Sequence, residues 1–66
     1  MEEHQIRVID ERDELTKKIV KLSTAMNNGI LYKVSITEQQ LLIDQLEVMK
    51  NYLHILERRI ALFIRS

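Results

Sequence analysis

A line of polar residues runs beside an apolar surface in the second half of the chain. Gln45, Tyr52 and Arg59 are seven residues apart, which places them along one line of a helix. Next to them runs a row of apolar residues at the same spacing, here named the apolar stripe: Leu41, Val48, Ile55 and Leu62. A guanidinium binds phosphate through two parallel hydrogen bonds, and a phenol ring can stack on a base. These residue types therefore suit a pocket for a phosphorylated nucleotide.

The same residue types also suit a purely structural role. Polar side chains within an apolar helix interface can form a hydrogen-bonded layer that fixes the register and the number of subunits. Both interpretations stay open on this pattern. If the first half of the chain folds back on the second, Glu11 comes near Tyr52, and His4 comes near Arg59. The candidate ligand-binding residues are then His4, Arg7, Glu11, Lys21, Gln45, Tyr52 and Arg59, with Arg7, Lys21 and Arg59 as phosphate ligands.

Other chemistries find no support in the sequence. The chain has no cysteine, and its two histidines, His4 and His54, are fifty residues apart, so thiolate zinc sites and helical histidine pairs are excluded. No serine, threonine or carboxylate stands in a recognisable catalytic arrangement. We therefore expect no catalytic residue, no metal site, no cofactor and no enzyme activity.

Size and charge narrow the class of protein further. A 66-residue chain forms one small domain, and such a core rarely supplies more than about 3–5 kcal/mol, so oligomerisation is a common remedy. The formal net charge is zero, which argues against nucleic acid as a partner. The longest apolar run, residues 60–64, is far shorter than the roughly 20 residues of a transmembrane helix. Since the N-terminus is acidic and unlike a signal peptide, we expect a cytoplasmic protein without membrane contact.

Apolar spacing predicts two helices. The first, at about residues 3–26, has one apolar face: Val8, Leu15, Ile19, Leu22 and Met26. It ends at Asn27-Asn28-Gly29, where Gly29 suits the left-handed position after a helix. The second helix, at about residues 38–64, carries an unbroken heptad pattern, here named the seam: Leu42, Leu46, Met49, Leu53, Leu56, Ile60 and Phe63.

Two overlapping capping boxes compete for the start of the second helix. Ser35 with Glu38 forms one box, and Thr37 with Gln40 forms the other. We favour Thr37, because Ile36 and Leu41 would then form the matching hydrophobic staple.

The predicted fold is all-α, with residues 1–66 as a single domain. Two long helices joined by a short connector, residues 27–36, form an antiparallel hairpin. The first helix can cover only the seam, so the apolar stripe must meet another protomer or a partner protein. We therefore expect hairpins to assemble into a helical-bundle homo-oligomer, most simply a four-helix dimer, with an interface made of Leu41, Val48, Ile55 and Leu62.

Both helices carry residues that match the pattern of a known protein family. The matching positions in the first helix are His4, Gln5, Arg7, Val8, Glu11, Glu14, Leu15, Ile19, Lys21 and Leu22. Those in the second are Gln45, Leu46, Met49, Tyr52, Ile55, Leu56, Arg59 and Ile60. This pattern resembles a family of very small phage and prophage proteins named after a crAssphage orphan protein. The resemblance spans nearly the whole chain, and residues 27–37, which include the connector, depart from it.

This resemblance implies a phage accessory protein that acts inside the host cell. By analogy with other tiny oligomeric phage proteins, we expect a sponge that sequesters a cyclic nucleotide or ADP-ribose-type immune signal at subunit junctions. An inhibitor or adaptor that docks a host defence protein through the second helix is the alternative, and a structural phage protein without a ligand is the third.

Overall fold

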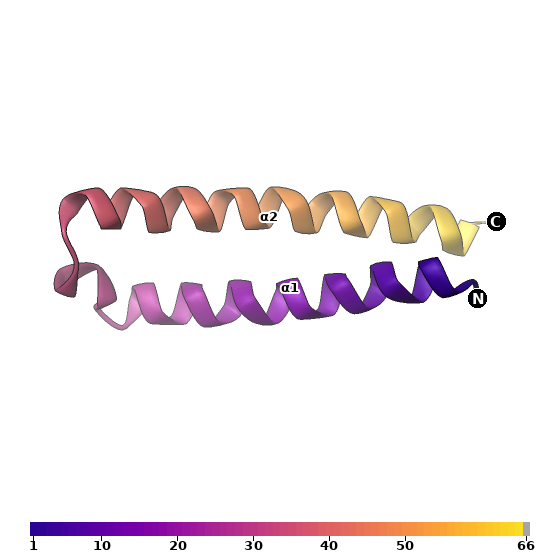
Figure 1. Cartoon of the computed structure of the whole chain (residues 1–66), viewed down its shortest axis with the longest axis horizontal. Coiled ribbons are helices and arrows are strands. Elements are labelled where there is room, and N and C mark those ends of the chain that lie inside the picture. Colours follow the sequence, from indigo (N-terminus) through magenta and orange to yellow (C-terminus); the bar gives the residue numbers. More distant parts are fainter. Residues whose placement is uncertain (66) are drawn as a thin grey trace.

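The computed structural model describes residues 1–65 as two long helices connected by one short turn of 3-10 helix. The elements are α1 (Glu3–Asn27), η1 (Ile30–Lys33) and α2 (Ile36–Arg65), and the described residues contain no strand. The two helices run antiparallel, so that the start of α1 and the end of α2 lie at the same end of a rod of 47 × 15 × 15 Å (Figure 1). The prediction of an all-α helical hairpin is therefore confirmed.

The end of α1 depends on a glycine. The backbone N–H of Asn28 donates to the carbonyl oxygens of Thr24 and Ala25, at 3.0 and 3.2 Å, and closes the last turn. Gly29 then takes a left-handed conformation, with φ of 91°, as its position after the helix predicts. A Cβ at this position would meet only the Tyr32 ring, at an ordinary contact distance of 3.6 Å. The need for glycine thus comes from the backbone angle rather than from lack of space.

The start of α2 differs from the prediction. The Ser35 hydroxyl accepts a hydrogen bond from the backbone N–H of Glu38, at 3.1 Å, and the helix begins at Ile36. The preference for Thr37 as the capping residue is therefore wrong. Its supporting staple does not form, because Ile36 is 83% exposed and Leu41 is also exposed. Gln39 instead donates to the carbonyl oxygen of Val34, at 3.3 Å, and ties the new helix to the connector.

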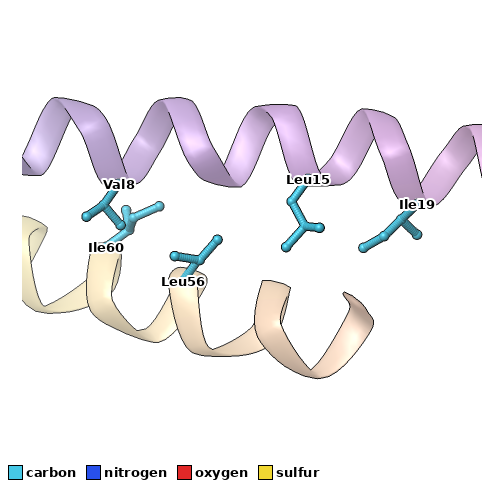
Figure 2. Packing of buried hydrophobic residues seen from close by; sticks show 5 residues of the cluster. All are labelled: Val8, Leu15, Ile19, Leu56 and Ile60. Carbon is cyan, nitrogen blue, oxygen red and sulfur yellow. The ribbon is translucent and has the colours of Figure 1, made fainter. Parts of the chain in front are cut away.

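The core lies along the line where α1 meets the seam of α2. Its buried residues are Val8, Leu15 and Ile19 from α1 and Leu56 and Ile60 from α2. Their side chains point toward one another between the helices, with Val8 beside Ile60 (Figure 2). Leu56 is completely buried. Partly buried side chains extend this core along the hairpin: Ile9, Leu46, Met49, Leu53 and Phe63.

The apolar stripe of α2 stays outside this core. The exposed fractions are 58% for Leu41, 65% for Val48, 54% for Ile55 and 66% for Leu62. Helix α1 thus covers the seam and leaves the stripe open, as the separation of the two rows around the helix predicts.

We predict that Leu56→Ala greatly destabilises the hairpin. Removing a fully buried leucine side chain costs about 2–5 kcal/mol, which is comparable to the whole stability expected of so small a core. Thermal unfolding followed by circular dichroism should therefore show a strongly lowered midpoint or an unfolded chain. Val20, which is 57% exposed on α1, provides the control, and Val20→Ala should change the midpoint little. Equal effects of the two substitutions would contradict this assignment of the core.

Candidate functional site

A side-chain hydrogen bond joins α1 to α2 at the edge of the core. The Tyr52 hydroxyl donates to the carboxylate of Glu11, across 41 residues of sequence. Glu11 lies between the buried Val8 and Leu15 in sequence, and Tyr52 lies one turn before the buried Leu56. The packing of these core residues therefore sets the register that brings the two polar groups together. The contact between Glu11 and Tyr52 that the antiparallel hairpin predicts is therefore confirmed.

Charges around Tyr52 favour its neutral, hydrogen-donating form. The hydrogen bond to Glu11 raises the pKa of the Tyr52 phenol above its ordinary value, and partial burial and the negative charge of Glu11 act in the same direction. The positive charge of Arg59 opposes them and lowers the pKa of Tyr52. Glu11 and Arg59 therefore act on the Tyr52 phenol with opposite signs, and the effect of Glu11 prevails.

Two arginines border an open hollow on the apolar stripe. The hollow has a volume of about 270 Å³ and is lined by Ile55, Arg58, Arg59 and Leu62, all from α2. The ion pairs within residues 1–65 are Arg7–Glu3, Arg12–Asp13 and Lys17–Glu14, which all lie in α1. Neither Arg58 nor Arg59 thus has a carboxylate of the described residues at ion-pair distance. Both guanidinium groups are available to an anion that sits against the apolar wall.

Arg58 is the lining residue that the sequence prediction missed. Helical spacing could have identified Arg58, because Arg58, Arg59 and Leu62 follow Ile55 by three, four and seven positions and therefore lie on one face.

The other candidate residues make separate contacts. The His4 ring packs edge-on against Phe63, with ring centroids 6.2 Å apart. Arg7 forms an ion pair with Glu3, with 2.9 Å between Nη2 and Oε1. Gln45 lies on the same side of α2 as Tyr52, and its Nε2 is 3.8 Å from the sulfur of Met49.

Lys21 is the candidate most distant from the Glu11–Tyr52 pair. Ten residues of α1 separate it from Glu11, which corresponds to about 15 Å along the helix axis. The described structure thus groups Glu11, Tyr52 and Arg59 and leaves Lys21 apart from them.

Residues 1–65 contain no cluster of three or more histidine, aspartate or glutamate side chains that could hold a metal ion. None of the described helices is both long enough and apolar enough to cross a membrane.

We predict that Glu11 keeps Tyr52 protonated to higher pH than a free tyrosine. The chain has two tyrosines, so Tyr32→Phe, at a position 93% exposed, leaves Tyr52 as the one tyrosine observed. In this background, ultraviolet titration should place the ionisation of Tyr52 above the ordinary value of about 10. Because folding raises this pKa, the stabilising hydrogen bond should persist below about pH 10 and be lost as the pH rises through the folded-state pKa.

The matched test of this prediction is Glu11→Gln in the same Tyr32→Phe background. Glutamine keeps a hydrogen-bond acceptor but removes the negative charge, so the ionisation midpoint of Tyr52 should fall. An unchanged midpoint would show that Glu11 does not set the pKa of Tyr52.

Comparisons with known proteins place this chain in a family. The model of the family described as Sequestin matches residues 2–62, a range that contains all seven candidate ligand-binding residues. The chain is also 43% identical, over 60 residues, to a protein of Enterobacteria phage T4 described as an uncharacterised 7.5 kDa protein in the denB–rIIB intergenic region. This match covers 91% of the chain and 94% of the T4 protein. No solved structure gives a significant match. The resemblance to a family of small phage proteins is thus confirmed, and the chain belongs to the Sequestin family.

Proposed function

We propose that this protein is a non-enzymatic phage accessory protein that sequesters a phosphorylated nucleotide signal of host defence in the host cytoplasm. One observation supports it above all: a tyrosine held by Glu11 and a guanidinium without a carboxylate partner among residues 1–65 lie on the same side of the hairpin, beside exposed apolar surface. The family name, which points to sequestration, and the phage origin of the T4 relative agree with this proposal.

Each member of the group has a role in this binding. Arg59, at the edge of the hollow, holds a phosphate through parallel hydrogen bonds. Tyr52, 40% exposed, offers a ring on which a base can stack. Glu11 orients that ring, and the remaining acceptor capacity of its carboxylate suits ribose hydroxyls or exocyclic amines. Binding of this kind needs no catalytic group, because sequestration requires affinity rather than turnover.

The ligand is held at a junction between subunits. Small-molecule pockets usually cover 70–90% of their ligand, and one side of a two-helix hairpin offers only an open hollow. The exposed apolar stripe lies beside that hollow, with Ile55 and Leu62 shared between the two. A second subunit placed on the stripe would close the hollow.

An adaptor that docks a host defence protein is the second candidate function. It is favoured by the stripe itself, since contiguous exposed apolar residues often mark protein-binding surfaces. The two functions differ in what must occupy the stripe: a second subunit in the sponge, a host protein in the adaptor. A phage structural protein without a ligand is the remaining alternative, and it predicts no small-molecule binding.

Calorimetry against a panel of cyclic dinucleotides and ADP-ribose derivatives tests the sponge. We expect binding of at least one of them by the unmodified protein. Tyr52→Phe should weaken binding modestly, because phenylalanine still stacks, and Tyr52→Ala should abolish it. Absence of heat with every member of the panel, together with the absence of a co-purified ligand, would favour the adaptor.

Arg59→Lys should weaken ligand binding by roughly 10–100-fold, because lysine cannot supply the planar fork and hydrogen bonds to charged groups contribute about 1.5–3 kcal/mol. Arg12 provides the matched control, since its guanidinium pairs with Asp13 within α1. Arg12→Lys should bind as the unmodified protein does, and equal binding by the two variants would remove Arg59 from the site.

The ligand-free stability of an Arg59→Ala variant separates a ligand role from a structural one. If Arg59 serves an absent phosphate, its removal should leave the thermal midpoint of the empty protein unchanged or raise it, because positive charges then repel one another less. A midpoint several degrees lower would support a structural ion pair instead.

A further inference from the structure

The hairpin exposes more surface than a compact protein of its mass. Its accessible surface is 5314 Å² for a mass of 7.9 kDa, whereas a compact monomer of that mass exposes about 4,400 Å². The excess is close to the roughly 800 Å² that each partner contributes to a standard protein interface. The hairpin thus has the amount of surface that one further subunit would cover.

The apolar stripe is nearly symmetric about its own centre, which lies between Asn51 and Tyr52. An antiparallel copy of α2 placed across this centre opposes Leu41 with Leu62 and Val48 with Ile55. Every apolar residue of the stripe then meets another apolar residue of similar size. Such a contact is isologous, with the same surface used by both copies, as in most homodimers.

Residues on the two flanks of the stripe agree with the same register. On the flank away from α1, Asp44 opposes Arg58 of the second copy, and Asn51 opposes its own counterpart. In a parallel pair the two flanks would exchange places, which brings Arg58 of one copy beside Arg59 of the other, and these like charges repel. Charge complementarity therefore selects the antiparallel arrangement.

The flank toward α1 carries the candidate site. Tyr52 lies on this flank, because its hydroxyl reaches Glu11 of α1. In the antiparallel register Tyr52 opposes its own counterpart, and Gln45 opposes Arg59 of the second copy. A two-fold axis perpendicular to the plane of the two α2 helices keeps these flanks on one side of the pair. Both Tyr52–Glu11 pairs then face the space between the two α1 helices.

We propose that a second copy of this chain packs antiparallel on the apolar stripe and completes the ligand site. Each anion site consists of Arg59 from one copy and Gln45 from the other, on either side of a central pair of Tyr52 rings. One hairpin alone supplies only half of each site. The packing is inferred from surface area and charge. The ligand role of the site completed by the second copy rests on the proposed function.

Disulfide cross-linking tests the packing without any ligand. The chain has no cysteine, so an introduced thiol is the only one present. A mixture of Val48→Cys and Ile55→Cys proteins should form a disulfide-linked heterodimer under mild oxidation, and each variant alone should cross-link much more slowly. Glu57→Cys, on the opposite side of α2, is the control and should not cross-link. Rapid self-linking of each stripe variant would indicate a parallel pair and overturn the proposal, as would no cross-linking at all.

Charge exchange gives an independent check of the register. Asp44→Arg alone should weaken self-association at least tenfold in sedimentation equilibrium, because it opposes Arg58 of the second copy with a like charge. The double variant Asp44→Arg, Arg58→Asp should restore association. Failure of the double variant to recover would remove this pair from the interface.

Mixing two defective variants tests whether the site is shared between copies. Gln45→Ala and Arg59→Ala proteins should each bind a cyclic dinucleotide or ADP-ribose probe at least tenfold more weakly than the unmodified protein. An exchanged mixture should regain part of the high-affinity sites, because each heterodimer has one Gln45 opposite one Arg59. A mixture that regains nothing would show that both residues act from the same copy.

The cross-linking and the probe-binding experiments distinguish a failure of the packing from a failure of the ligand role. Heterodimer cross-linking without any probe binding by the unmodified protein would keep the packing and overturn the proposed ligand role. Probe binding by a chain that stays monomeric would keep the ligand role and overturn the packing.

Discussion

The constraint on which this structure depends is that α2 has two apolar rows and only one helix of the same chain to cover them. Helix α1 covers the seam, where Leu56 is completely buried. The apolar stripe stays more than half exposed along its whole length. A hairpin with so small a core gains little further stability by itself. The stripe is therefore the surface that both the proposed assembly and the proposed function use.

The Tyr52–Glu11 hydrogen bond connects the core to the candidate site. Core packing sets the helix register, the register brings Glu11 to Tyr52, and this contact favours the neutral phenol. Arg59 lies two turns after Tyr52 on the same side of α2, beside the apolar stripe. It has no carboxylate partner among residues 1–65. A guanidinium in such a position can bind a phosphate through two parallel hydrogen bonds. The same arrangement thus supports both phosphate binding and subunit contact.

The sequence pattern predicts the elements that follow from periodicity and backbone chemistry. The seam residues and the left-handed Gly29 belong to this class. It wrongly favours Thr37 over Ser35 as the capping residue, because both capping boxes have the same chemistry and the expected staple does not form. Arg58 was missed because its place beside the hollow follows from its helical neighbours Ile55 and Leu62, and not from the line of Gln45, Tyr52 and Arg59. The periodicity of a sequence shows which faces of a helix are apolar. It does not show which molecule covers a face, because that depends on the surface of the partner.

Native mass spectrometry of the protein purified from cells with an active defence system tests the central claim most directly, because it reports subunit number and retained ligand together. The account predicts an even-numbered assembly of the 7.9 kDa chain that carries the added mass of a phosphorylated nucleotide. This added mass should disappear in the Tyr52→Ala variant while the assembly persists. A bare monomer, folded and without ligand, would contradict both the assembly and the function proposed for it.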